Sequence, residues 1–355
     1  MERIHIAVFG AVNSGKSTLV NKIAGQELSL VSGQPGTTTD PVRKAIEIPG
    51  LGPCVLTDTA GYGDSSALGA ERERMSRAAI DPADVAVLLL SGHPDDAKWA
   101  ELLKEAEVPT VTATRGESAE SIIRRIAGVL PEEENKYLTG DLVKSGDTVV
   151  LVMPQDSEAP KGRLILPQVQ VLRELLDRGC LPVCCVPEKL GEALSSLKSD
   201  PALVITDSQV FKAVNEKIPP TVPLTSFSIL LAGAKGDLNV YFEGARAIGS
   251  LKDGDRVLIA EACTHVPDTE DIGRVKIPAL LRKRAAVSVD IAAGNDFPED
   301  LSPYSLIIHC GACVASRTLV RARIKKALRA GVPITNYGIA LASLQGISER
   351  LGIKL

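Results

Sequence analysis

The chain has 355 residues, of which 45% are hydrophobic and 24% are charged, and this balance is typical of a globular protein with two or three domains. Forty Lys and Arg residues against 44 Asp and Glu residues leave a net charge of −4, and only 3% of the residues are aromatic. The composition therefore offers neither a strongly basic surface nor base-stacking side chains, and we expect no nucleic-acid partner.

The chain also lacks the patterns of membrane and secreted proteins. No apolar run reaches the roughly 18 residues that a spanning helix needs, and the start MERIHIAVFGAV leads from charged residues directly into a strand, unlike a signal peptide. We expect a cytoplasmic protein with no membrane partner. There are seven cysteines, and an odd number in a reducing compartment predicts no disulfide framework. Four of them lie in apolar runs and are expected to be buried small hydrophobes: Cys54, Cys180, Cys184 and Cys185.

The first part of the chain alternates strands with amphipathic helices. Strands are predicted over 3–10, 54–58, 84–90 and 109–114, and helices over 16–24, 69–80 and 96–106. A second series begins near residue 140, with strands over 146–154, 181–187 and 201–207 and helices over 166–179 and 188–198. A Pro-rich stretch at 217–223 marks a boundary. The third series has strands over 256–261, 286–291, 305–310 and 332–335 and a helix over 314–331.

This alternation predicts an α/β protein with three domains and mainly parallel sheets. We expect the domains to cover residues 1–138, 139–222 and 223–355. The helix over 166–179 is more apolar than a free surface helix usually is. Two explanations remain open for it, a subunit interface and an ordinary core helix.

Residues 10–17, GAVNSGKS, match the phosphate-binding pattern Gly-x-x-x-x-Gly-Lys-Ser between a strand and a helix. Gly10 and Gly15 let the backbone bend so that its amides face a polyphosphate, and the helix N-terminus adds a favourable dipole. Lys16 is expected to reach the β- and γ-phosphates, and Ser17 to bind magnesium. The expected nucleotide contacts in this loop are Gly10, Asn13, Ser14, Gly15, Lys16, Ser17 and Thr18.

Two further segments fit nucleotide binding. DTAG, at 58–61, ends a strand, so that Asp58 can hold the magnesium shell through water and the amide of Gly61 can face the γ-phosphate. The Gly- and Thr-rich loop over 33–41 contains Thr37, Thr38 and Thr39, one of which could close on the magnesium. We take Thr37 and Thr38 as nucleotide contacts, with Thr38 as the magnesium ligand.

In this order and spacing the segments resemble the switch regions of a GTPase. The resemblance is to the potassium-dependent, translation-factor-like branch, which carries an Asn at the position of Asn13 that helps to hold K⁺. That branch lacks a Gln after its Asp-x-x-Gly motif, and Tyr62 stands there in this chain. The resemblance implies that Lys16, Asp58 and Gly61 carry any catalysis, and that GTP hydrolysis, where it occurs, is slow and stimulated by potassium.

The Asn-Lys-x-Asp motif with which GTPases read guanine is absent from the sequence. The segment over 110–122, TVTATRGESAESI, resembles the part that follows the last strand of such domains. We interpret the first domain as truncated by about one strand–helix unit. Phosphate binding is then retained, whereas selectivity for guanine is in doubt.

The third domain contains a cysteine–histidine constellation. One predicted strand leads to Cys263 and His265, and another ends at His309, Cys310 and Cys313. Both sets lie at the carboxyl ends of strands, where open α/β sheets place their ligands. Three thiolates with a His fit zinc or a 4Fe–4S cluster with an exchangeable position, and the Cys-x-x-Cys pair alone fits thiol–disulfide chemistry. The spacing does not choose among these sites.

Cys-x-His followed by a distant His-Cys-x-x-Cys resembles the signature of HydF, the FeFe-hydrogenase maturation GTPase family. The similarity extends over essentially the whole chain, for example in the segments PKGRLILPQVQ, LKDGDRVLIAEACTH and FPEDLSPYSLIIHCGAC. It implies a GTPase domain, a dimerisation domain and an iron–sulfur domain. By resemblance, Cys263, Cys310 and Cys313 bind a 4Fe–4S cluster, with His265 and His309 as candidate fourth ligands.

The same resemblance implies the biological role. HydF proteins are scaffolds that carry a di-iron subcluster to apo FeFe-hydrogenase, alongside radical-SAM maturases, as homodimers or larger assemblies. The cofactors implied are the 4Fe–4S cluster, GTP, Mg²⁺, K⁺ and the transient di-iron subcluster. Two alternatives stay open: a P-loop protein with a zinc or thiol redox-regulatory site, and a family member that binds a cluster but no nucleotide.

Overall fold

The computed structural model describes residues 3–25, 42–61, 69–130, 137–155, 162–262, 271–294, 296–313 and 315–351. The chain divides into two compact units, one of residues 1–134 with 316–323 and one of residues 135–315 with 324–355. Among the described residues, no helix combines the length and the apolar character that crossing a bilayer requires.

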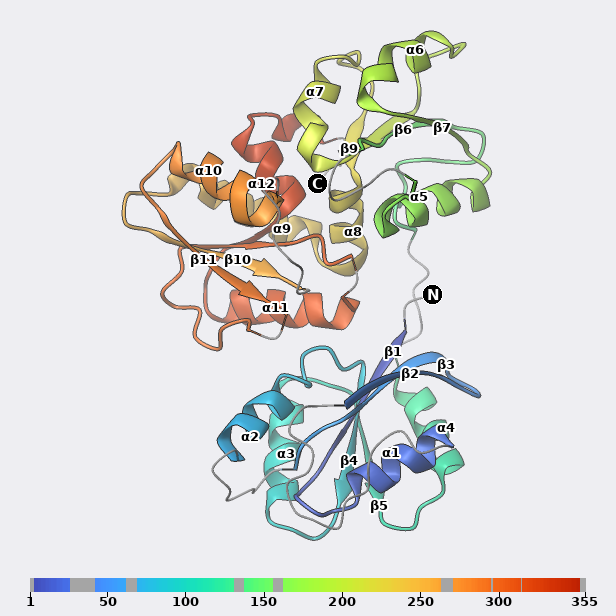
Figure 1. Ribbon diagram of the computed structural model, residues 1–355, viewed down its shortest axis with the longest axis vertical. Coiled ribbons are helices and arrows are strands. Elements are labelled where there is room, and N and C mark those ends of the chain that lie inside the picture. The colour runs from blue at the N-terminus through green and yellow to red at the C-terminus, as the bar shows by residue number, and fades with distance from the viewer. Residues whose placement is uncertain are drawn as a thin grey trace. The chain divides into compact units, whose positions relative to one another are not determined.

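The first unit contains a five-stranded sheet in the order β2-β3-β1-β4-β5, with only β2 antiparallel. Alternate side chains of β1 enter two separate cores, Ile6 and Val8 with α1 and α4, and Ala7 and Phe9 with α3. Figure 1 shows these helices on opposite faces of the sheet. The strands are β1 Ile4–Phe9, β2 Val42–Ile48, β3 Gly52–Asp58, β4 Val85–Leu90 and β5 Thr110–Thr114. The helices are α1 Lys16–Ala24, α2 Gly69–Arg77, α3 Asp95–Glu105 and α4 Ala119–Val129.

The second unit contains two parallel four-stranded sheets. The first, in the order β7-β6-β8-β9, packs against α5 and α8 through a core that includes Val149, Leu175 and Phe227. Its strands are β6 Thr148–Val152, β7 Leu181–Cys185, β8 Leu203–Thr206 and β9 Leu224–Ser226. Its helices are α5 Leu166–Asp177, α6 Leu190–Ser195, α7 Phe211–Asn215 and α8 Phe227–Lys235.

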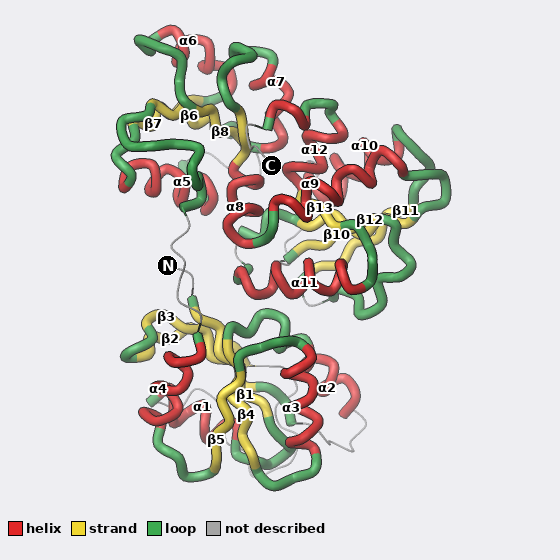
Figure 2. Tube along the Cα trace, turned by 180° about the vertical axis from the view of Figure 1, so that it is seen from behind, coloured by secondary structure: helices red, strands yellow, loops and turns green. Residues whose placement is uncertain are grey.

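The other sheet of this unit has the order β11-β10-β12-β13. The helices α9, α10 and α12 lie together on one side of it (Figure 2). Its strands are β10 Arg256–Glu261, β11 Ser288–Ala293, β12 Leu306–His309 and β13 Ile334–Asn336. The helices are α9 Leu238–Arg246, α10 Ile277–Arg282 and α12 Tyr337–Leu344. Helix α11, Arg317–Arg329, is divided, with its residues up to 323 in the first unit and the rest in the second. The predicted α/β architecture of three domains with mainly parallel sheets is confirmed.

Three local features differ from the expectations. The antiparallel strand β2 was not predicted. The strand β9 lies just after the expected boundary at 222, yet it pairs with β8 and completes the second sheet. Cys54 and Cys180 are buried as expected, but Cys184 is exposed and Cys185 is half-buried, because β7 is the edge strand of its sheet and is poorly covered.

Candidate functional site

The phosphate loop joins β1 to α1 through backbone conformations that favour glycine. Gly15, at the N-cap of α1, has a φ of 102°, and Asn13 also lies in the left-handed region, with a φ of 59°. A Cβ on Gly10 would approach the carbonyl oxygen of Leu89 to 2.9 Å. Within this bend the buried hydroxyl of Ser14 has no hydrogen-bond partner among the described residues. The loop therefore has the backbone shape, and an uncommitted donor, that a bound phosphate requires.

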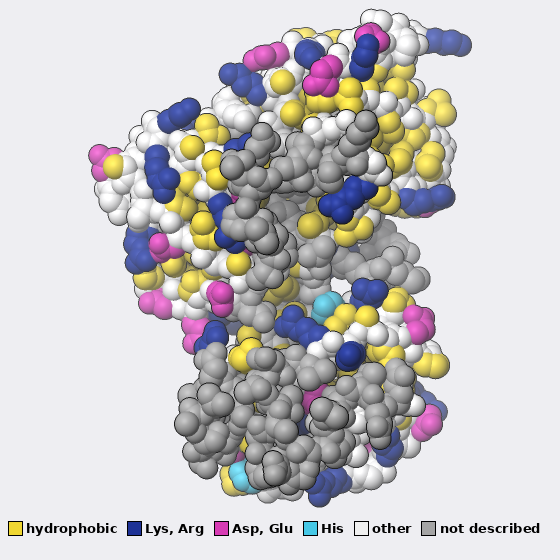
Figure 3. Space-filling view, viewed as in Figure 1, with side chains coloured by type: hydrophobic (Ala, Val, Ile, Leu, Met, Phe, Trp, Pro, Cys, Tyr) yellow, Lys and Arg dark blue, Asp and Glu magenta, His cyan; other side chains and the backbone are white. Residues whose placement is uncertain are grey.

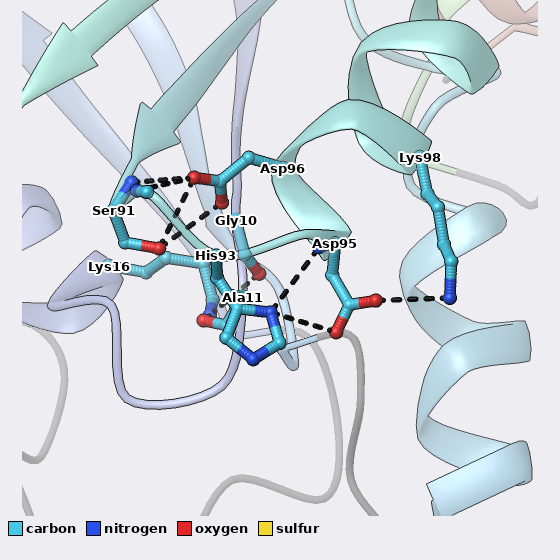
Figure 4. Close-up of polar contacts among 9 residues, drawn as sticks. Gly10, Ala11, Lys16, Ser91, His93, Asp95, Asp96 and Lys98 are labelled. Atoms are coloured by element: carbon cyan, nitrogen blue, oxygen red, sulfur yellow. Dashed lines mark hydrogen bonds and ion pairs between the residues drawn. The ribbon is translucent and has the colours of Figure 1, made fainter.

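Lys16 is buried beneath this loop, and its ammonium donates to the carbonyl oxygens of Gly10 at 3.1 Å and Ala11 at 2.7 Å (Figure 4). Burial lowers the pKa of Lys16 to about 8, although the carboxylates of Asp58 and Asp96 oppose this shift. Asp58 is itself buried, at the end of β3. A phosphate would replace the carbonyl partners of Lys16 with full negative charge, so the arrangement favours an anion at this position.

Nucleotide binding should therefore take up a proton. At pH 8 about half of the Lys16 side chains are neutral in the free protein, and all must be charged beside a polyphosphate. We expect an uptake of about 0.5 proton at pH 8, and a Kd for GTP that rises about tenfold per pH unit above roughly pH 9. Isothermal titration in buffers of different ionisation enthalpy measures the uptake. Lys104→Met, which changes an exposed lysine of α3, is the control and should leave the uptake unchanged. Absence of proton uptake at pH 8 would contradict the prediction.

Gly61 packs directly on the phosphate loop. A Cβ at this position would lie 2.5 Å from the Cα of Val12, so no larger residue fits without moving the loop. Neighbouring hydrogen bonds hold the segment in place: the hydroxyl of Thr59 donates to the carbonyl of Val8 at 2.7 Å, and that of Ser76 in α2 donates to the carbonyl of Ala60 at 3.0 Å. The predicted pair of Asp58 and Gly61 therefore lies beside the loop that it was expected to serve.

The loop after β4 and the start of α3 lie near Lys16 and the phosphate loop. The carboxylate of Asp96 accepts from the backbone N–H of Ser91 at 2.7 Å and of Gly92 at 2.9 Å (Figure 4). Asp95 forms an ion pair with Lys98 at 3.0 Å, and its backbone N–H donates to the Nδ1 of His93 at 3.3 Å. Asp96 thus fixes the end of β4 and places a negative charge near Lys16. Sequence reasoning assigned it no role.

Arg115 was also missed. It follows β5, and its guanidinium donates to the carbonyl oxygens of Ser14 at 3.1 Å and Asn13 at 3.0 Å. Arg115 therefore stabilises the phosphate loop from the end of β5. A basic residue directly after a strand was the only available signal. Of the other residues predicted to contact the nucleotide, Ser17 is half-buried and Thr18 is exposed in the first turn of α1. Thr37, Thr38 and Tyr62 lie outside the described residues.

The cysteine loop follows β12, in the second unit. Ala260 of β10 pairs with His309, and its carbonyl accepts from the N–H of Cys310 at 2.9 Å. The sulfur of Cys310 accepts from the backbone N–H groups of Ala262 at 3.1 Å and Ala312 at 3.4 Å. Backbone donors to sulfur stabilise a thiolate, which is the form that binds metal. Ala262 is the last described residue before Cys263.

The other candidate ligands are only partly described. Cys310 and Cys313 are half-buried. His309 is buried, and its Nδ1 lies 2.8 Å from the carbonyl oxygen of Cys310, so this nitrogen must donate rather than accept. Cys263 and His265 lie outside the described residues. Within the part of the chain that the structure describes, no three His, Cys, Asp or Glu side chains form a metal site.

Buried polar groups surround the carboxyl ends of β10 and β13. Arg274 forms a two-point ion pair with the buried Glu261, at 2.7 and 3.1 Å. Burial, together with the charge of the nearby Cys310, raises the pKa of Tyr337 well above its usual value. A Cβ on Gly273 would fall 1.9 Å from the Tyr337 hydroxyl oxygen. The Cys310 loop thus borders a closely packed polar region.

Comparison with known families identifies the family of the chain. Residues 138–236 match the Hydrogen maturase F dimerization domain, residues 239–353 match the Hydrogen maturase F tetramerization domain, and residues 5–115 match a 50S ribosome-binding GTPase domain. The chain belongs to the HydF family. This combination of domains indicates a hydrogenase-maturation GTPase, and the dimerization and tetramerization domains indicate a HydF protein that forms oligomers.

Two curated GTPases are similar to this HydF chain over part of its length. The tRNA modification GTPase MnmE of Nitrosomonas eutropha is 41% identical over 117 residues, which cover 31% of this chain and 26% of the relative. GTPase Der of Clostridium novyi is 42% identical over 104 residues, or 28% of this chain and 24% of the relative. The chain thus spans about a quarter of each. Among solved structures, the match to Era of Aquifex aeolicus covers 84% of this chain and 97% of the Era chain, with 16% sequence identity and a TM-score of 0.29.

Proposed function

We propose that this protein is a cytoplasmic scaffold that binds a 4Fe–4S cluster through Cys263, Cys310 and Cys313, and that delivers a di-iron subcluster precursor to apo FeFe-hydrogenase after radical-SAM maturases have supplied it. The observation that carries the proposal is the pair of backbone N–H groups directed at the sulfur of Cys310, in a chain of the HydF family. Three cysteine ligands leave one iron with an exchangeable position, for which His265 and His309 are the candidates in this sequence.

In this proposal the GTPase domain controls the activity of the scaffold through bound nucleotide. A GTPase domain binds GTP with Mg²⁺, and here Lys16, Ser17 and Asp58 would meet the phosphates and the metal. Asn13 would hold K⁺. Hydrolysis would be slow, and it would time subunit association or cargo release. We assign residues 1–138 to this domain, extend the dimerisation domain to about residue 236 because β9 completes its sheet, and assign the remainder to the iron–sulfur domain.

The middle domain has a surface suited to self-association. Exposed apolar side chains gather over α5 and the edge strand β7 (Figure 3). Leu181 is 61% exposed and Val169 is 46% exposed, and they lie with Leu164, Leu166 and Leu176 on this face. An uncovered edge strand also presents unpaired backbone groups that a second copy can pair with. These features support a homodimer formed through this face.

Substituting this face should lower the oligomeric state. The double variant Val169→Asp/Leu181→Asp places two charges where apolar contact is expected, and burying an unpaired charge is costly. Light scattering should show about half the mass of the wild-type assembly at the same concentration, because only one of the two kinds of interface is removed. Val129→Asp is the matched control, because Val129 is 39% exposed on α4 of the GTPase domain. An unchanged mass for the double variant would exclude this face as the interface.

Anaerobic reconstitution followed by transfer to apo-hydrogenase tests the proposal directly. The protein should take up about four irons per chain and show a broad charge-transfer band. After loading by the maturases, it should activate apo-hydrogenase. One zinc per chain without colour would instead identify a zinc or thiol regulator, and colour without activation would reject the carrier role.

A further inference from the structure

Lys235, the last residue of α8, is buried and only 6% exposed. Its ammonium donates to three carbonyl oxygens of a single loop, at 2.9 Å to Ala312, 3.3 Å to Cys313 and 2.8 Å to Ala315. Burying a lysine is costly unless its charge and donors find partners. Here those partners are carbonyls of the loop that carries Cys310 and Cys313.

The loop conformation depends on Ala312. This residue has a φ of 51°, in the left-handed region that alanine seldom adopts. Its carbonyl accepts from Lys235, while its N–H points at the sulfur of Cys310. Ala312 therefore makes both contacts. The hydrogen bond from Lys235 and the hydrogen bond to the Cys310 sulfur both depend on the backbone conformation of this residue.

The helix that ends in Lys235 also packs against α5. Phe227 and Leu230 of α8 share a core with Val171 and Leu175 of α5. Helix α5 is the one whose opposite side carries the exposed apolar residues. Helix α8 therefore lies between the candidate dimer face and the cysteine loop.

We propose that Lys235 is a positioning residue for the cluster-binding cysteines. It holds Ala312 in the left-handed turn, keeps the N–H of Ala312 on the Cys310 sulfur, and places a positive charge where it favours an anionic group bound by these thiolates. Outer partners of this kind orient ligands and tune metal sites. The inference rests on the proposed cluster site, but the loop contact itself can be tested without a cluster.

The first measurement uses the full-length protein without iron. Hydrogen exchange of the amides over 310–316 should be at least severalfold faster in Lys235→Met than in the wild type, because three hydrogen bonds to the loop are lost. Lys235→Arg, which keeps charge and donors, should restore slow exchange. Lys217→Met is the matched control: it also removes a lysine–carbonyl bond, 2.9 Å to Pro187, but away from this loop.

The second measurement uses the reconstituted proteins. Lys235→Met should bind iron about 10- to 100-fold more weakly than the wild type, as expected when an outer partner is removed. The cluster that remains should have a more negative reduction potential, because a nearby positive charge stabilises the reduced form. Lys235→Arg and Lys217→Met should resemble the wild type. A purely structural lysine would leave the potential unchanged.

The outcomes separate the two proposals. If the wild type binds no iron, the proposed function fails, while hydrogen exchange still decides the contact between Lys235 and the loop. Wild-type exchange and wild-type potential in Lys235→Met would overturn the inference. If Lys235→Met does not fold, Lys235→Gln replaces it, since the amide keeps a donor and loses only the charge. A wild-type potential in Lys235→Gln would then overturn the role of the charge.

Discussion

Replacing Cys310 by alanine is expected to reduce the iron of the reconstituted protein from about four per chain to fewer than about one. The sulfur of Cys310 accepts two backbone N–H groups, and a methyl group can neither use these donors nor bind iron. The charge-transfer band should disappear with the iron. GTP binding should be retained, because the phosphate loop belongs to the other unit.

Cys180→Ala is the control for this variant. Cys180 is more deeply buried than Cys310, lies in the middle domain and donates to the carbonyl of Lys144 at 3.4 Å. Its loss should leave a small cavity and full iron content. Full iron in the Cys310→Ala protein, measured beside this control, would show that the cluster is bound elsewhere.

Gly244→Ala should give the largest loss of stability. Gly244 lies on α9 against β13, where a Cβ would fall 2.0 Å from the carbonyl oxygen of Ile334 and 2.5 Å from its carbon. The obstacle is backbone, and Ile334 is fixed by its pairing with Ile307 of β12. Overpacking of this kind costs about 3 kcal/mol or more. We expect the calorimetric Tm of the second unit to fall by roughly 10 °C, or the protein to become insoluble.

Gly249→Ala is the matched control, because no heavy atom lies within 4 Å of a Cβ built there. It should change the free energy of unfolding by less than about 0.5 kcal/mol. Equal Tm values for the two variants would mean that α9 can move away from β13 at little cost.

Local chemistry explains what the sequence could predict. The phosphate loop needs glycines and a lysine at fixed spacing, and parallel strands need apolar runs between helices, so both are visible in short windows. The open cysteine alternatives were narrowed by family resemblance rather than by spacing. Cys263, Thr37 and Thr38 remain predictions, since they lie outside the described residues.

Features set by contacts between distant segments could not be predicted in this way. Cys184 belongs to an apolar run, but its exposure depends on β7 being an edge strand. Arg115 is 101 residues from the carbonyl of Ser14 that it contacts, and Lys235 is 77 residues from Ala312. Neither residue belongs to a motif, and each acquires its role only when the fold brings its partner close.

The contact between Gly61 and Val12 has a mechanical consequence. With no room for even a methyl group between them, the turn after β3 and the phosphate loop cannot move closer together. A displacement of the loop towards the turn must push the turn, and the hydrogen bond from Ser76 to Ala60 passes that displacement to α2. Movement of the phosphate loop would thus reach a helix without any side chain at position 61.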